Sequence, residues 1–385
     1  MHTRNWVHGQ RSWVRGRRSW VHGRRSRGHG RRTTAVALAG VAIAGSVGIP
    51  AAADAANSNA PAPARTVSEE ATRPGPSTDP GFPTFVHMPA DQAAHPNAKQ
   101  EWWYTVGHIR AGGHKYGYEV QLSRKGITQI SITDEASGAY ASEQKAFKPD
   151  QFSASADELD VRMPNASLSG PLDAMHLKTE LPQGKGTLDL KLKAVGPTLY
   201  NNGTGLFPFL DDTSYYYSLP NLQTTGTLTL DGATKQVTGT SWLDRQWGNW
   251  SWDTLHKWTW MAVRLDNGQV LNLWDMFDTN GEKHWATVLS PDGTHRVVSV
   301  NPLAPQATHF ESSPTTGQRY AGKWTVTIPT LNTELIVTAS PTLQEIQANQ
   351  PFTPGINEAD SSVRGTYQGR PVTGEAYVEQ FGLWN

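Results

Sequence analysis

Between Ser241 and Trp260 the chain reads SWLDRQWGNWSWDTLHKWTW, which places six tryptophans around one Asp-Arg pair. Each indole has a large apolar area that favours burial and one N–H that needs a partner. Trp258 and Trp260 are two residues apart, so on a strand they share one face of a sheet. The stretch therefore predicts an aromatic-lined barrel or cleft that opens beside Asp244 and Arg245. The alternative is a core that is simply rich in tryptophan.

The charge of the chain is uneven along its length. Of 34 basic residues ten lie in residues 1–32, whereas only one of the 34 acidic residues, Asp54, precedes residue 56. Residues 56–385 therefore carry a net charge of −9. Phosphate binding needs a cationic face, so nucleic acid is not an expected partner. The chain has no cysteine, so its stability cannot come from disulfides, and a lipoprotein anchor at the cleavage site is excluded.

The first 55 residues are predicted to be a signal peptide with a basic low-complexity extension. Arg31 and Arg32 precede an apolar run over residues 35–49 that is too short to span a membrane, and Ala53-Asp54-Ala55 provides a cleavage pattern. The paired arginines favour secretion by the twin-arginine route, with the general secretory route as the alternative. Residues 56–80 are rich in Ala, Pro, Ser and Thr, and we expect a disordered linker there.

From Phe82 onward the pattern predicts an all-β protein. Short alternating runs are separated by hairpin dipeptides, and helical periodicity is scarce, the best short candidate being residues 142–147. The dipeptides that we expect in hairpin turns are Asp231-Gly232, Asn267-Gly268, Asn280-Gly281 and Asp292-Gly293.

Two segments resemble each other: a Trp-led strand, a tight turn and a second apolar or aromatic strand occur from Glu101 and again from Lys257. This repeat predicts two related β-domains, residues 81–240 and residues 241–385.

These segments also resemble a known family, the carotenoid 1,2-hydratase or hydroxyneurosporene synthase-like family, also called AttH-like. The matching pieces run in the family's order over nearly all of residues 82–385: they are Glu101-Trp102-Trp103-Tyr104, Tyr215–Pro220, Gly239–Gly248 and Gly369–Glu379. The resemblance implies two lipocalin-like antiparallel β-barrels packed side by side. It extends to fungal cyclases that form decalin rings, so it implies either water addition to alkenes or pericyclic ring closure, without a cofactor. Gln246 departs from the family, which usually has an acidic residue there.

Hydration of an unactivated alkene needs a strong general acid in a dry, apolar site. A carboxyl group in such a site has a raised pKa and keeps its proton, and facing aromatic rings stabilise a developing cation. Three acidic residues lie among aromatic residues in this way, so the catalytic candidates are Asp244, Glu101 and Glu379. Asp244 could instead be ion-paired with Arg245 or cap a turn, and Glu101 could satisfy a strand end.

The rings of the same segments are the expected substrate-binding set: Trp103, Tyr104, Tyr216, Trp247, Trp260, Trp274 and Tyr377. The histidines are too scattered to predict a zinc site, and no G-x-S-x-G motif indicates a serine hydrolase. Two functions stay open. One is a hydratase or cyclase acting on a hydrophobic polyene or isoprenoid, and the other is an extracellular lipocalin-like binding protein for an apolar or carbohydrate ligand. The sequence does not fix the oligomeric state.

We expect residues 1–80 to be dispensable for folding, because leader and linker segments bury little apolar surface. Protein that begins at Gly81 should unfold in urea with the same midpoint and cooperativity as protein that begins at Ala56. A lower midpoint for the shorter protein would show that the linker contributes to the fold.

Overall fold

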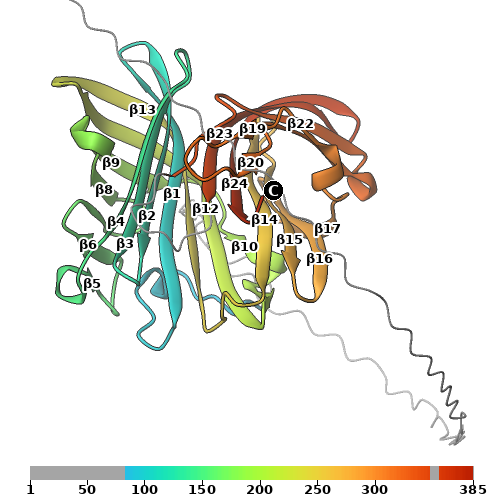
Figure 1. Cartoon of the computed structure of the whole chain (residues 1–385). Helices are drawn as coiled ribbons and strands as arrows, with labels where there is room; N and C mark the ends of the chain where they lie inside the picture. The colour runs from blue at the N-terminus through green and yellow to red at the C-terminus, as the bar shows by residue number, and fades with distance from the viewer. Residues whose placement is uncertain (1–82, 347–354, 385) are drawn as a thin grey trace, which may run out of the picture. The chain divides into compact units, whose positions relative to one another are not determined.

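The computed structural model describes residues 83–346 and 355–384 (Figure 1). Within these ranges the regular structure is strands and short 3-10 helices, with no α-helix, which confirms the predicted all-β fold. None of the described helices is long and apolar enough to span a membrane. The predicted signal peptide and linker lie outside the described residues. The 3-10 helices are η1 (Ala90–Gln92), η2 (Pro149–Gln151), η3 (Pro182–Gly184), η4 (Asn201–Gly203), η5 (Ala304–Gln306) and η6 (Pro329–Leu331).

The first sheet is antiparallel and has 13 strands, coloured from blue to yellow in Figure 1. Its path runs β4-β3-β2-β1-β13-β12-β9-β8-β7-β6-β5, and β10 and β11 pair with β12. The strands are β1 (Gln100–Ala111), β2 (His114–Ser123), β3 (Ile127–Asp134), β4 (Ala139–Ala146), β5 (Ser153–Ala154), β6 (Asp160–Met163), β7 (Ala166–Ser169), β8 (Met175–Glu180), β9 (Gly186–Ala194), β10 (Leu199–Tyr200), β11 (Leu206–Phe209), β12 (Asp212–Leu230) and β13 (Ala233–Gly248).

The second sheet has nine strands in the order β17-β16-β15-β14-β24-β23-β22-β21-β18, and β19 and β20 form a separate pair. In both sheets the first strand pairs with the last, β1 with β13 and β14 with β24, so the internal repeat extends to the topology. The strands are β14 (Leu255–Leu265), β15 (Val270–Asp278), β16 (Gly281–Leu289), β17 (His295–Ser299), β18 (Ala307–Thr308), β19 (Glu311–Ser312), β20 (Arg319–Tyr320), β21 (Lys323–Ile328), β22 (Thr333–Ala339), β23 (Ile356–Tyr367) and β24 (Arg370–Gly382).

The structure can be compared with the predicted turns, the helix candidate and the domain boundary. All four turn dipeptides lie at connections of consecutive strands, β12–β13, β14–β15, β15–β16 and β16–β17, and Gly281 is already the first residue of β16. The helix candidate at residues 142–147 is wrong, because β4 pairs with β3 over Ala139–Ala146. The boundary placed after residue 240 falls inside β13, whose whole length belongs to the first sheet, and the second sheet begins at Leu255. Both sheets belong to one compact unit of the chain.

Three clusters of buried residues explain how the sheets are filled. The first sheet encloses an apolar core that includes Leu168, Leu190 and Leu243. The second encloses a core that includes Leu273, Val326 and Val337. The third cluster takes residues from both sheets and is mostly aromatic; it includes Tyr104, Phe209, Tyr216, Trp242, Trp250, Trp258, Trp260 and Trp274. Because side chains alternate along a strand, one face of β1, β13, β14 and β24 fills a barrel and the other face meets the opposite sheet.

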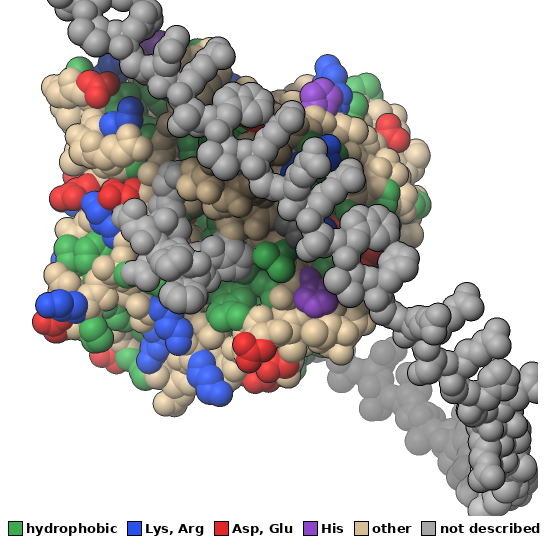
Figure 2. Space-filling model, viewed as in Figure 1, with side chains coloured by type: hydrophobic (Ala, Val, Ile, Leu, Met, Phe, Trp, Pro, Cys, Tyr) green, Lys and Arg blue, Asp and Glu red, His purple; other side chains and the backbone are tan. Residues whose placement is uncertain are grey.

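Basic and acidic side chains are interspersed on the face shown in Figure 2, with histidine side chains among them. A cationic face for nucleic acid would instead gather Lys and Arg on one surface. The expectation that nucleic acid is not a partner stays a prediction.

Two glycines allow the sheets to curl at matching places. Gly226 in β12 and Gly365 in β23 each lie on the strand next to the last one, with φ of +146° and +157°. A Cβ atom at either position would lie 2.1 Å from a carbonyl oxygen of the neighbouring strand, that of Asp189 or Glu334. Only glycine fits such a close approach of two backbones.

Gly365→Ala should therefore lower the free energy of unfolding by about 1–3 kcal/mol, because the strand must move away from β22 or adopt a strained backbone. The matched control is Gly138→Ala, which has φ of +69° but open space around the added Cβ. Urea denaturation should show a smaller loss for the control. Equal losses would mean that backbone conformation alone, and not the close approach, requires glycine at residue 365.

Candidate active site

A cavity of about 220 Å³ lies between the facing surfaces of the two sheets. The first sheet contributes Trp102 and Tyr104 from β1 and Tyr216 from β12. The second contributes a larger aromatic set: Trp258, Trp260, Trp274 and Phe381, with Trp252 from the connection between the sheets. The site is thus outside both barrels, in the third cluster.

The alternation of β13 decides which of its residues reach the cavity. Asp244 and Gln246 line it, whereas Leu243 and Trp247 belong to the core of the first sheet. Arg245 therefore points away from Asp244 into the first barrel, and it pairs with Glu101 at 3.0 Å. The ion pair between Asp244 and Arg245 that the sequence left open is not formed.

Asp244 is a buried carboxyl that accepts hydrogen bonds from neighbouring side chains, two of them aromatic. The Tyr216 hydroxyl donates to Oδ2 and the Trp242 indole N–H donates to Oδ1, each at 2.6 Å. Only 2% of the residue is exposed. Burial raises the pKa of Asp244 to about 7, and the charge of Glu379 adds to this, although the hydrogen bonds act in the opposite direction. At neutral pH a large fraction of this carboxyl therefore keeps its proton.

A chain of hydrogen bonds from the second sheet orients the donor of Asp244. The Trp260 indole N–H donates to Asn272 Oδ1 at 3.2 Å, and Asn272 Nδ2 donates to the Tyr216 hydroxyl oxygen at 2.8 Å. Because that oxygen accepts from Asn272, its own proton is directed to Asp244. The two sheets thus share one polar network at the cavity wall.

Glu379 occupies the position in the second sheet that Asp244 occupies in the first. Asp244 lies opposite Tyr104 of β1, and Glu379 lies opposite Trp260 of β14, the matching strand of the repeat. The Trp258 indole N–H donates to Glu379 Oε1 at 2.5 Å. Part of Glu379 is exposed to the cavity, yet it is deep enough that burial raises its pKa to about 7. Two carboxyl groups with raised pKa values therefore line one cavity.

Two further acidic residues lie behind this wall, and the sequence did not indicate them as site residues. Glu358 is opposite Glu379 on β23 and accepts a hydrogen bond from the Tyr104 hydroxyl at 2.7 Å. Burial, followed by the charges of Glu379 and Glu119, raises the pKa of Glu358 well above its usual range. Burial raises the pKa of Glu119 to about 8. In the alternating run of β2, Glu119 has the pattern of a solvent-facing residue, so only knowledge of the opposite sheet could have identified it.

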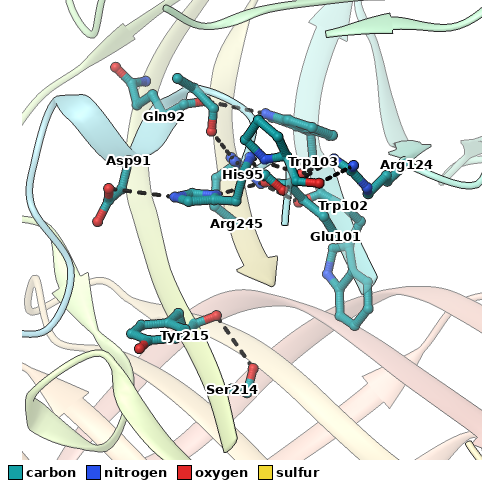
Figure 3. A network of polar contacts seen from close by, with 12 residues as sticks. Asp91, Gln92, His95, Glu101, Trp102, Trp103, Arg124, Ser214, Tyr215 and Arg245 are labelled. Atoms are coloured by element: carbon teal, nitrogen blue, oxygen red, sulfur yellow. Dashed lines mark hydrogen bonds and ion pairs between the residues drawn. The ribbon is translucent and has the colours of Figure 1, made fainter. Parts of the chain in front are cut away.

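Glu101 lies in a different environment, which Figure 3 shows. It accepts hydrogen bonds from the His95 backbone N–H and from Arg245, and His95 Nδ1 lies 2.8 Å from Oε1. Burial alone would raise the pKa of Glu101, but hydrogen bonding from His95 and the charge of Arg245 outweigh it, and the pKa is lowered. An ionised carboxylate is not a proton donor, and Glu101 is not among the residues that line the cavity.

Some of the predicted substrate-binding rings line the cavity, and the others are packed in the buried clusters. Tyr104, Tyr216, Trp260 and Trp274 line the cavity. The other three do not, since Trp103 and Trp247 lie in the first core and Tyr377 packs deeper in the third cluster. The Arg245 guanidinium lies 4.1 Å above the Trp103 ring, and His95 stacks on Trp247 with ring centroids 4.0 Å apart. These two indoles thus support the buried Arg245 and Glu101 pair. Four further rings, which the predicted substrate-binding set does not include, line the cavity: Trp102, Trp252, Trp258 and Phe381.

In the described ranges one group of side chains has the spacing of metal ligands: His108, Glu135 and Asp360, whose ligand atoms lie within 4.8 Å of one another. His108 Nδ1 is 3.0 Å from Asp360. Burial alone would lower the pKa of His108, but the Asp360 charge and hydrogen bond outweigh it and raise the pKa to about 9. In this structure His108 and Asp360 thus form an ion pair.

Comparison with known proteins identifies the family. The AttH-like family model matches residues 81–383. This chain belongs to the AttH-like family. The fold of the family is seen in an AttH protein from Nitrosomonas europaea, with a TM-score of 0.69 and 24% identity over 81% of this chain and 100% of that one. Kievitone hydratase from Nectria haematococca has a TM-score of 0.66 and 19% identity over 76% of this chain and 92% of that one. The lipocalin-like fold that the resemblance implied is confirmed.

Two curated fungal relatives match by sequence. Dehydratase asqC of Emericella nidulans is 27% identical over 204 residues, which is 50% of this chain and 57% of that protein. Kievitone hydratase of Fusarium solani subsp. phaseoli is 30% identical over 120 residues, 29% of this chain and 34% of that protein. The chain thus matches about half or less of the length of these relatives.

Trp247 lies in the core of the first sheet and Trp260 borders the cavity, so removal of one indole should mainly affect stability and removal of the other should mainly affect binding. Trp247→Ala should cost roughly 3–5 kcal/mol of stability, because it opens a void in the first core. Trp260→Ala should cost less, because its ring borders a cavity, but it should weaken binding of an apolar fluorescent probe such as 1-anilinonaphthalene-8-sulfonate. Urea denaturation and probe titration measure the two effects. A larger stability loss for Trp260→Ala together with unchanged probe affinity would contradict the cavity assignment.

Proposed function

We propose that this protein is a lyase of the hydratase or dehydratase type, which adds water to a carbon–carbon double bond or removes it. The observation that carries the proposal is the Asp244 carboxyl, buried on the wall of an indole-lined cavity with a pKa raised to about 7. A general acid works best when its pKa is near the working pH. The names of the two curated relatives, a dehydratase and a hydratase, support the same reaction class.

In the proposed reaction Asp244 gives its proton to one alkene carbon, and the positive charge develops on the other. Water then bonds to that carbon and loses a proton to Glu379, so the sum is alkene plus water giving an alcohol. Asp244 ends ionised and Glu379 ends protonated, and exchange with solvent restores both. Dehydration follows the same steps in reverse.

The surroundings of the two carboxyls suit this chemistry. The rings of Trp258, Trp260 and Trp274 border the cavity, and aromatic rings stabilise a nearby cation through their π-systems. The cavity of about 220 Å³ has the volume of roughly seven waters. It therefore has room for an isoprenoid-sized segment, whereas a complete carotenoid chain would have to extend out of it. The proposal includes a hydrophobic isoprenoid-type substrate, no cofactor, and secretion of the protein.

Gln246 affects which residue is proposed as the proton donor. Its amide lines the cavity two residues from Asp244 and donates to the Ser214 hydroxyl oxygen at 2.8 Å. The amide at the position where the resemblance implies a usual acidic residue cannot donate a proton in its place, and the proposal assigns that role to Asp244. Ring closure without proton transfer is the alternative enzyme function.

The direct test is incubation of the purified protein with isoprenoid alcohols such as geraniol in H2¹⁸O, followed by mass spectrometry. A product heavier by one ¹⁸O-labelled water supports hydration. Retention of the unchanged compound on the protein without any product would favour the alternative of a lipocalin-like binding protein.

Asp244→Asn should abolish any such turnover and change the pH dependence of stability. A carboxyl that is folded with a pKa of about 7, against ~3.9 when unfolded, binds its proton more tightly in the folded state. Its contribution to stability is fully present below the unfolded pKa and is lost as pH rises through the folded pKa. Asparagine does not titrate, so the variant should gain stability relative to wild type, by up to a few kcal/mol, as pH rises from about 4 to about 8.

The matched control is Asp275→Asn, since burial raises the pKa of Asp275 to about 6 but the residue does not line the cavity. It should also alter the pH dependence of stability while leaving turnover intact. Full activity in Asp244→Asn would exclude Asp244 as the acid and leave Glu379 as the candidate.

A further inference from the structure

The cavity has one wall that an apolar substrate does not explain. Gln121 on β2, Gln129 on β3 and Gln144 on β4 all line it. Their positions are directly opposite across the strand pairs, Gln121 with Gln129 and Gln129 with Gln144. Gln121 Nε2 donates to Gln129 Oε1 at 2.6 Å, and Gln129 Nε2 donates to Gln144 Oε1 at 2.8 Å. We call these three side chains the glutamine ladder.

Placing amides here has a physical cost. Gln129 and Gln144 are only 5% and 6% exposed, and a buried amide is costly to keep unless it is hydrogen-bonded. Each amide has two N–H groups and an oxygen with two lone pairs, so the ladder bonds use only part of the capacity of Gln129. Apolar side chains would fill the same face without this cost. The polar character continues at Gln100 and Ser123, which also line the cavity, and at the exposed Lys125 beside them.

The walls of the cavity therefore differ in chemistry. Indole and phenyl rings from the second sheet line one part, with Asp244 and Glu379 beside them. Amide and hydroxyl groups on β1 and β2, together with the ladder and one apolar side chain, Ile127, line the part contributed by the edge of the first sheet. A hydrocarbon that displaced water would leave the second N–H and the second lone pair of the Gln129 amide unused, which costs binding free energy.

We propose that the glutamine ladder is a binding subsite for hydroxyl or carbonyl oxygens, so that the ligand is a neutral, oxygenated isoprenoid and not a pure hydrocarbon. The apolar, unsaturated arm lies against the indoles and the oxygen end lies against the ladder. This inference rests on the proposed function only for the position of the double bond near Asp244. The binding preference stands on the ladder itself.

The test compares two probes of equal carbon number, geraniol and myrcene, an alcohol and a hydrocarbon. Their dissociation constants are measured with the full-length protein by quenching of tryptophan fluorescence and by equilibrium dialysis. Wild type should bind geraniol about three- to tenfold more tightly than myrcene, which is the worth of one or two net hydrogen bonds. Gln129→Met, which keeps the length of the side chain but removes the amide, should bring this ratio close to one.

The matched control is Gln92→Met. Gln92 is also a buried glutamine, 3% exposed, but it lies in the first barrel against Met175 and does not line the cavity. It should keep the wild-type ratio. If Gln129→Met does not unfold cooperatively, Gln121→Met replaces it, because Gln121 is only half-buried and has a single ladder partner.

Equal affinity of wild type for both probes, or an equal effect of Gln92→Met, would overturn the subsite. The outcome is separate from that of the catalytic proposal. A preference for geraniol that depends on Gln129, together with no turnover, keeps the subsite and overturns the lyase. Turnover of geraniol without tighter binding of geraniol than of myrcene keeps the lyase and overturns the subsite.

Discussion

The strict alternation of side chains along β13 is the constraint on which the rest of the structure depends. Asp244 and Arg245 are neighbours in sequence, and one lines the cavity between the sheets while the other enters the first barrel. Arg245 is completely buried, so its charge must be compensated within the barrel. Glu101, the backbone carbonyl oxygens of Trp102 and Ala93, and the faces of Trp103 and Trp247 provide that compensation. Arg245 is thus used structurally, and Asp244 is left in the cavity wall without a cation from its own strand.

The internal repeat explains why the cavity has two carboxyls of similar character. The outer faces of β1 and β14 carry an aromatic pair at matching positions, Trp102 with Tyr104 and Trp258 with Trp260. The last strand of each sheet pairs with this first strand and places an acidic residue opposite the second ring. When two such faces meet, each carboxyl is enclosed by the other sheet as well as its own. A single barrel with the same sequence would expose that face to water, and the pKa of its carboxyl would stay near the ordinary value.

The sequence predicts well those elements that depend on neighbouring residues, such as hairpin turns. It predicts less well which side chains of a strand face the barrel core and which face the cavity. Asn-Gly and Asp-Gly dipeptides fix hairpin turns by their own conformational preference, so all four were found. Trp102 and Trp103 look alike in the sequence, and only the pairing of β1 shows that the second faces the barrel core. The sequence predicts an acid in an apolar site at Glu101, because its partners, His95 and Arg245, come from other segments. Glu119 and Glu358 were missed for the converse reason, since a polar residue in an alternating strand ordinarily faces solvent.

The four buried carboxyls also bear on why residue 246 is an amide. Asp244, Glu379, Glu358 and Glu119 all have raised pKa values, and the charge of Glu379 contributes to each of the other three. A group of this kind can be folded at neutral pH only if most of its members keep their protons. A fifth carboxyl at residue 246, on the same face as Asp244, would raise these pKa values further and increase the cost of folding. Gln246 instead donates to Ser214, so that each sheet presents one carboxyl to the cavity, Asp244 from the first and Glu379 from the second.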